Sequence, residues 1–349
     1  MPPVEAWKKV LVSEGFFAEA HGQYDCTYCH GGDADMGDMA AAHTGMNTDP
    51  SAKCATCHPV AAEDFATSQH SQLMGYRQVI AARAGVAELT PGLETMFEQN
   101  CNTCHATCGQ CHISRPNSVA KGFVRGHEFL RRPSMTENCT ACHGSRVGQE
   151  FRGQHEGIPA DLHYNMGMQC VACHAAEEMH GHGDQGSNRY EVASAPQCED
   201  CHQSLEENAY HSAHGDRLSC QVCHSVDYKN CYSCHVGEGL ERPSELGFKI
   251  GRNPLQSSER PYEYTVLRHI PIAPDSYRDF APEGLANFAA LPTWKHATPH
   301  NIQLRTPQTA NCTDSCHNNS GIFLTEADLA DMSAEEVEAN QGVVVRRIP

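Results

Sequence analysis

The cysteines of this chain follow one rule. All 20 occur in pairs, and a histidine follows the second cysteine of every pair directly. Nine pairs have the spacing C-x-x-C-H and the last has C-x-x-x-C-H. The cysteines are Cys26, Cys29, Cys54, Cys57, Cys101, Cys104, Cys108, Cys111, Cys139, Cys142, Cys170, Cys173, Cys198, Cys201, Cys220, Cys223, Cys231, Cys234, Cys312 and Cys316. The histidines are His30, His58, His105, His112, His143, His174, His202, His224, His235 and His317.

This spacing has a chemical use. Residues three apart on a helical turn point the same way, so two such thiols can form thioethers with the two vinyl groups along one side of a porphyrin. The histidine that follows can then bind the iron as its proximal ligand. The motifs predict ten c-type haems, which we number 1 to 10 in chain order. The extra residue of the tenth motif must be absorbed as a local bulge.

Two other uses of cysteine compete with this interpretation. An even number of cysteines in an exported protein commonly means disulfides. Zinc sites combine cysteine pairs into closed sets of four ligands, but they do not require a histidine after each pair. A histidine after all ten pairs favours haem over both alternatives.

Thirteen further histidines can supply the sixth ligand of each iron, which predicts mostly bis-histidine haems of low potential. The better-placed candidates are His21, His43, His70, His127, His163, His180, His211, His214, His269 and His300, and the weaker ones are His155, His182 and His296. His211 and His214 are three apart, so one helical face can serve two different haems. We interpret Met36, Met39 and Met46 as packing residues, because imidazoles are abundant.

The composition argues against an ordinary core. Only 40% of the 349 residues are apolar and 7% aromatic, with 28 glycines and 19 prolines. Stacked porphyrins must therefore replace aliphatic side chains. The predicted fold is mostly irregular, with short α-helices wrapped around a haem array and little β-structure. We expect three regions: a nine-haem region at 1–238, a proline-rich haem-free arm at 239–311, and the tenth haem with an acidic tail at 312–349.

Some elements can be predicted locally. Residues 262–269 are a plausible strand within an otherwise irregular arm. The spacings Thr325/Asp328 and Ser333/Glu336 predict capping boxes in a partly helical tail. The terminal stretch 342–349 is expected as a surface strand on its own subunit, or less readily as a strand added to a neighbour.

The charge limits the partners. A net charge of -18 excludes nucleic acid, because a phosphate backbone requires Lys and Arg. No apolar run is long enough for a membrane-spanning helix. The first residues lack the pattern of a secretory leader, so we expect that a leader was removed.

The ten motifs, Cys29-His-Gly-Gly, the fused pair of motifs from Cys101 to His112 and the spread of extra histidines together resemble the multihaem cytochromes c of anaerobic, metal-respiring and related bacteria and archaea. The resemblance implies a periplasmic or extracellular protein that passes electrons to other cytochromes or redox proteins, or to extracellular metal oxides. A homopolymeric filament is a further role, in which a long arm could place haem 10 beside a neighbour's first haem. A porin-embedded conduit fits less well, because nine motifs are crowded early in the chain.

An enzyme is the alternative, similar to hydroxylamine-oxidising or nitrite- and tetrathionate-reducing multihaem cytochromes. Such an enzyme needs one iron with an open site. In nitrite reductases a lysine replaces a motif histidine, and no motif here contains that change. An electron carrier that works by hopping between haems is therefore the favoured prediction, with no catalytic residues.

Overall fold

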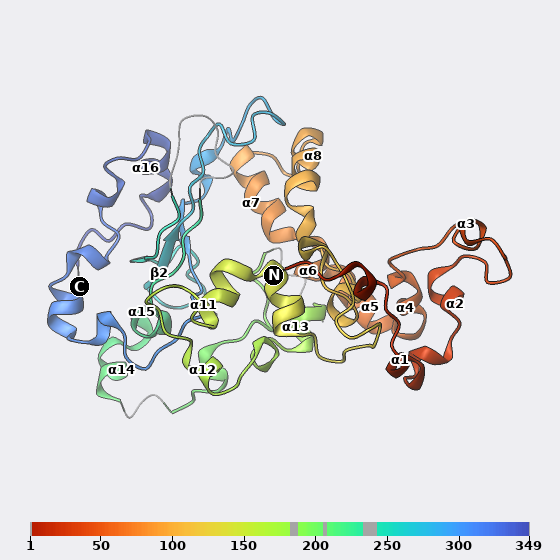
Figure 1. The fold of residues 1–349 in the computed structure, drawn as a ribbon. Coiled ribbons are helices and arrows are strands. Elements are labelled where there is room, and N and C mark those ends of the chain that lie inside the picture. Colours follow the sequence, from red (N-terminus) through yellow and green to blue (C-terminus); the bar gives the residue numbers. More distant parts are fainter. Residues whose placement is uncertain (1, 182–187, 205–207, 233–242, 349) are drawn as a thin grey trace. The chain divides into compact units, whose positions relative to one another are not determined.

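The computed structural model describes residues 2–181, 188–204, 208–232 and 243–348. Short helices, tight turns and irregular segments dominate these residues, and three strands form one small sheet (Figure 1). The prediction of a mostly irregular fold with short helices and little β-structure is confirmed. In the described ranges, no helix has the length and apolar character needed to cross a membrane.

By packing, the chain forms two discontinuous units. Unit 1 comprises residues 1–74, 99–144 and 169–195, and unit 2 comprises 75–98, 145–168 and 196–349. Unit 1 contains the motifs of haems 1 to 6, and unit 2 contains those of haems 7 to 10. The three regions expected from the sequence were defined by the haems that they would contain and not by packing. They therefore stay a prediction.

Unit 1 consists of short helices joined by loops. Its α-helices are α1 (Glu14–Ala18), α2 (Cys26–His30), α3 (Met39–Ala42), α4 (Ser51–Cys57), α5 (Pro59–Thr67), α6 (Gln69–Gln72), α9 (Cys108–His112), α10 (Thr140–Cys142) and α13 (Ala176–His180). Helices this short are unstable in isolation. Their stability must come from what they pack against.

Unit 2 combines helices with the sheet. Its helices are α7 (Met74–Ala84), α8 (Pro91–Asn100), α11 (Gln149–Phe151), α12 (Leu162–Asn165), α14 (Ala209–His214), α15 (Cys220–His224) and α16 (Ala334–Asn340). The ends of α7 and α8 extend by a residue or two into unit 1. The strands are β1 (Lys249–Arg252), β2 (Tyr264–His269) and β3 (Trp294–His296).

The sheet is antiparallel with β2 in the centre. Ile250 of β1 pairs with Val266 of β2, and both belong to one apolar cluster, whereas the next residue, Leu267, belongs to a second cluster. Successive strand residues point to opposite faces, so β2 is buried on both sides. The predicted strand at 262–269 is confirmed. The arm that we expected to be irregular thus provides the whole sheet.

The C-terminal tail covers this sheet. Val343, Val344 and Val345 are buried, and the backbone N–H of Arg252 donates to the Val343 carbonyl at 2.9 Å. The expectation of a surface strand here is wrong, because these valines complete the two clusters around β2. Both predicted capping boxes are confirmed, at Thr325/Asp328 and at Ser333/Glu336. The second begins α16, which lies beside the sheet (Figure 1) and accepts a hydrogen bond from the backbone N–H of Trp294 through Asn340.

Candidate metal centres

The attachment motifs lie on single helical turns. In α2, α9 and α15 the helix runs from the first cysteine of the motif to its histidine. Residues i and i+3 share a face there, so both sulfurs point to one side. Gly31 ends α2 directly after His30, with a φ of 72° that favours glycine. The chain can thus leave the helix at once behind the histidine.

The tenth motif accommodates its additional residue in a different kind of helical turn. Residues Cys312–His317 form a π-helical turn, capped by the Asn311 side chain, which accepts from Thr313 and Asp314. A π turn accommodates one extra residue within a helix. The predicted bulge therefore takes this form, and it begins at the first cysteine and ends at the histidine as in the shorter motifs.

Among the described residues, seven motif histidines lie opposite a second histidine within their own unit. The ring centroids in these pairs are 5.9–6.2 Å apart. Two metal–imidazole bonds of about 2 Å, plus the distance from each nitrogen to its ring centre, give about 6 Å. Each gap therefore fits one iron. The pairs are His30 with His127, His58 with His21, His112 with His180, His143 with His70, His202 with His163, His224 with His211, and His317 with His214.

Helix α14 supplies two of these partners. His211 lies opposite the motif histidine of haem 8, and His214 opposite that of haem 10. The helix is only six residues long, and Gly215 follows at its end. The three-residue spacing thus places the two rings opposite two different motif histidines, and the binding of two haems by this helix stays a prediction.

Burial keeps several of these imidazoles neutral. Burial, aided by the neighbouring His143, lowers the pKa of His70 to about 4. Burial is also the main cause that lowers the pKa of His143, His127 and His180. A neutral imidazole has the free lone pair that binds a metal, so these side chains are in the form that iron requires.

His127 also has an unusual backbone. Its φ is 77°, a left-handed conformation that few residues other than glycine adopt. Its ring packs edge-on against Phe16 and Phe123, with centroids 4.8 and 4.6 Å away. Strained residues of this kind cluster at functional sites, and here the strain aims the imidazole at His30.

In four motif histidines, Nδ1 lies within hydrogen-bonding distance of a partner, which is a backbone carbonyl in three of them and a carboxylate in the fourth. Nδ1 of His112 lies 2.7 Å from the carbonyl of Leu130, and the same contact is 2.8 Å from His30 to Asn47 and 3.1 Å from His224 to Gln303. At His174 the partner is a carboxylate instead, since Nδ1 lies 2.8 Å from Glu178 Oε2. This hydrogen bond is the main cause that raises the pKa of His174. Glu178 is not among the site residues predicted from the sequence, although its position four residues after the motif histidine is a signal that a helix would bring the two side chains together.

Sulfurs of different motifs approach one another. In unit 1, thiol–thiol hydrogen bonds join Cys54 to Cys108, Cys104 to Cys142, and Cys139 to Cys170. In unit 2, a thiol–thiol hydrogen bond joins Cys198 to Cys220. Cys223 and Cys316 pack against one apolar cluster. The thioether edges of the corresponding haems would meet at these places.

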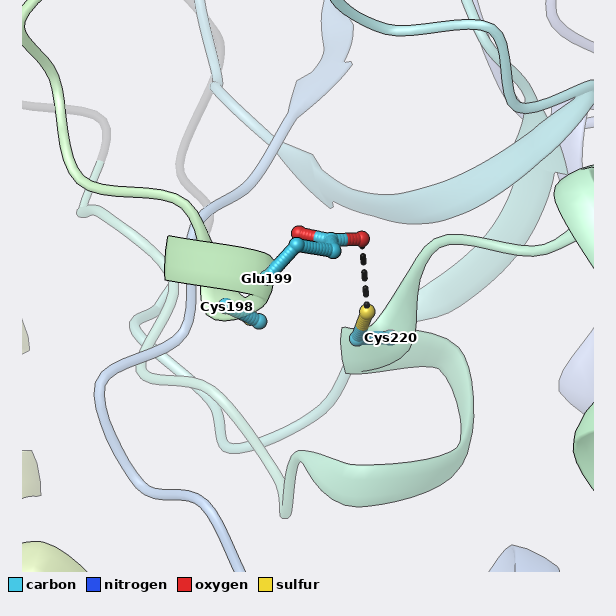
Figure 2. Close-up of side chains that lie close together, drawn as sticks. All are labelled: Cys198, Glu199 and Cys220. Carbon is cyan, nitrogen blue, oxygen red and sulfur yellow. Dashed lines mark hydrogen bonds between the residues drawn. The ribbon is translucent and has the colours of Figure 1, made fainter. Parts of the chain in front are cut away.

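One such meeting point looks like a metal site. Figure 2 shows Cys198, Glu199 and Cys220, whose ligand-type atoms all lie within 4.8 Å of one another. Glu199 accepts from Cys220 Sγ at 3.6 Å and from the Tyr262 hydroxyl at 2.8 Å. Both sulfurs belong to attachment motifs, so thioether formation would consume them and leave one carboxylate, too few ligands for zinc. We interpret the cluster as the meeting point of haems 7 and 8.

A cavity of about 480 Å³ in unit 1 is lined by the motif histidine His58 and by His180. By the pairing above, these two histidines would bind haems 2 and 4, and the motifs of these haems are also joined by the Cys54–Cys108 contact. The cavity therefore lies where these two porphyrins would be.

The remaining candidates lie elsewhere. His269 is buried on β2, with Nε2 3.5 Å from Glu336 Oε1 and its ring against Trp294. Nδ1 of His43 and of His300 contact the carbonyls of Met39 and Thr298. In the ring contacts of the described residues, no second histidine lies beside the motif histidine His105. Cys234, His235 and His182 lie outside these residues. Met36, Met39 and Met46 are exposed among the protein atoms of unit 1, and their interpretation as packing residues stays a prediction.

Comparison with known proteins gives one match. Residues 21–187 match the family described as outer membrane cytochrome MtrC/MtrF-like, domains II/IV. The matched stretch contains the motifs of haems 1 to 6. Neither a curated protein nor a solved structure matches the chain. Together with the motifs, the match makes this chain a multihaem c-type cytochrome of electron transfer.

Proposed function

We propose that the chain carries ten covalently attached c-type haems, most of them bis-histidine, and conducts electrons by hopping between them. The observation that carries the proposal is the set of seven histidine pairs, each with a separation that fits one six-coordinate iron. Six-coordinate iron has no free position for a substrate, so the pairs favour an electron carrier over an enzyme. The chain supplies the ligands and the thioether cysteines, and the haems supply the redox chemistry.

The sulfur contacts support hopping. Within unit 1 they bring together haems 1 and 2, 2 and 4, 4 and 5, 3 and 5, and 5 and 6, and within unit 2 haems 7 and 8, and 8 and 10. Neighbouring thioether edges leave little protein between porphyrins. We therefore propose that haems 1 to 6 form one continuous run of closely spaced haems in unit 1, and that haems 7, 8 and 10 form another in unit 2.

The test is electron paramagnetic resonance of the oxidised protein, with carbon monoxide added to the reduced protein and a pyridine haemochrome count of haems. We expect ten haems, all low-spin, and no carbon monoxide binding. In the variant His214→Ala, the haem of His317 loses its sixth ligand, so one haem becomes high-spin and binds carbon monoxide. Ser212→Ala, on the same helix, is the matched control and should leave every haem low-spin.

Two results would contradict the proposal. A haem count well below ten would remove the cofactor assignment. A high-spin haem that binds carbon monoxide in the unaltered protein would favour the oxidoreductase alternative, with one open catalytic haem.

The location and partners form the finer part of the proposal. The matched family is one of outer membrane cytochromes, which supports a periplasmic or extracellular location, with other cytochromes, redox proteins or extracellular metal oxides as partners. Assembly into a homopolymer also belongs here. The tenth motif lends it less support than its sequence position suggested, because Cys316 lies near Cys223 of the same chain. Electron microscopy of native material tests this point, and monomeric particles would contradict it.

A further inference from the structure

The proximal histidine of haem 6 has a different partner from those of haems 1, 4 and 8. At those three haems, Nδ1 of the motif histidine faces a backbone carbonyl, which is neutral. At haem 6, Nδ1 of His174 faces the carboxylate of Glu178 at 2.8 Å. The Glu178 side chain is 14% exposed, so solvent screens its charge only in part.

Local structure fixes this contact. Glu178 lies in α13, four residues after His174, and the same helix ends at His180, which lies opposite His112. Gly181 ends the helix at a φ of 76°, and a Cβ there would lie 2.8 Å from the backbone of Ser68. The helix is thus held against the chain next to α6, and Glu178 cannot move freely.

Asp161 shows why the contact at His174 is distinctive. Its Oδ1 lies 3.3 Å from Nδ1 of His163, the partner histidine of haem 7. The same oxygen already accepts the backbone N–H groups of His163 and Tyr164, as an N-cap of α12. Asp161 Oδ1 therefore already accepts the backbone N–H groups at the start of α12, whereas Glu178 Oε2 accepts from an imidazole.

The chemistry follows from the ligation. An imidazole bound to iron through Nε2 keeps its proton on Nδ1, which then donates. A carboxylate accepts this proton more strongly than a carbonyl does, because it is charged. The imidazole becomes a stronger electron donor, and the ferric state is favoured over the ferrous state.

We propose that Glu178 is a positioning residue that sets the reduction potential of haem 6, making it harder to reduce than the haems whose proximal histidines face carbonyls. The inference rests on the proposed function, since it requires His174 to bind iron. Haem 6 would then be the last of these haems to fill with electrons.

The test compares holoproteins by optical redox titration under anaerobic conditions. In Glu178→Gln the side chain keeps its shape and loses its charge, so one one-electron component should move to a higher potential. Glu63→Gln is the matched control, because it removes one exposed carboxylate from α5, which packs against α13. The control should leave every component in place.

A second measurement needs no variant. The near-infrared charge-transfer bands in magnetic circular dichroism report how strongly the axial imidazoles donate. In the unaltered protein, we expect the band of haem 6 to be displaced from those of haems 1, 4 and 8, and Glu178→Gln should move it toward their position.

The outcomes separate the two proposals. Equal titrations of the unaltered protein and Glu178→Gln, or equal shifts in both variants, would overturn the role of Glu178 while ten low-spin haems leave the proposed function intact. A lower haem count in the unaltered protein would instead overturn the proposed function. A potential shift confined to Glu178→Gln, with ten low-spin haems, is the result that we expect.

Discussion

The two units differ in what fills their interiors. Unit 1 contains six of the ten attachment motifs, yet only four of the 27 buried apolar side chains in the described part of the chain lie there: Phe16, Leu73, Ile113 and Met135. The others lie in unit 2, where 16 of them form three clusters around the sheet and its neighbouring helices. Full burial of one large apolar side chain stabilises a fold by about 1.5–3 kcal/mol, so four cannot offset the entropy of ordering so many residues.

This difference assigns different structural roles to the haems. In unit 1 the porphyrins must supply most of the buried apolar surface, and their thioethers must tie the short helices together. In unit 2 the polypeptide has a core of its own, and the haems are added to it. Haems attached through the same motif would thus form most of the core of unit 1 and be added to an existing core in unit 2.

The largest expected effect is that of removing the haems. A chain produced without haem attachment should lose the structure of unit 1 and keep that of the sheet, because only the sheet has a polypeptide core. Hydrogen exchange followed by mass spectrometry should then show protected amides in β1 to β3 and α16, and fast exchange throughout unit 1. The haem-loaded protein is the control, with protection in both units. Equal protection of both units in the haem-free chain would contradict the comparison.

A core substitution should have the next largest effect. Leu267 is fully buried in the centre of β2, and Leu267→Ala should cost about 2–5 kcal/mol through the lost contacts and the cavity. In the haem-free chain this would abolish the protection of the sheet. Met135→Ala removes a buried side chain of unit 1 and should leave the exchange of that chain unchanged. A loss of protection with Met135→Ala that matched Leu267→Ala would mean that unit 1 has a core without haem.

The sequence predicted what depends on neighbouring residues. The helical turns of the motifs, the double use of His211 and His214, the strand around Val266 and both capping boxes all follow from spacings of a few residues. The π turn at Cys312–His317 is the physical form of a bulge that the extra residue required.

Long-range packing could not be predicted in the same way. No local pattern links Cys54 to Cys108, or places Val343 to Val345 on both faces of β2, because these contacts join segments far apart in the chain. The units are also discontinuous, so boundaries drawn along the sequence cannot reproduce them. His269 illustrates the limit: its sequence context resembles that of the other candidates, and only the packing places it beside Glu336 and Trp294.

The smallest expected effect concerns an ordinary ion pair of unit 2. Lys249 of β1 lies 2.7 Å from Asp328, which also accepts from the N–H of Thr325 in the capping box.

Partial burial alone would raise the pKa of Asp328, but the Lys249 ammonium and the Thr325 donors together hold it below the usual 3.8. A carboxyl with a lowered pKa contributes stability above its unfolded pKa, and this contribution is lost as the pH falls through the folded value. Asp328→Asn should therefore cost about 1 kcal/mol near neutral pH, and this difference from the unaltered protein should shrink as the pH falls below 3.8 and vanish below the folded pKa of Asp328. Thermal unfolding of the haem-loaded protein across pH measures it, with Asp331→Asn, an exposed position in the same tail, as the control for charge alone. An equal, pH-independent loss in both variants would show that the ion pair between β1 and the tail contributes nothing, and that unit 2 is held by its apolar clusters and haems.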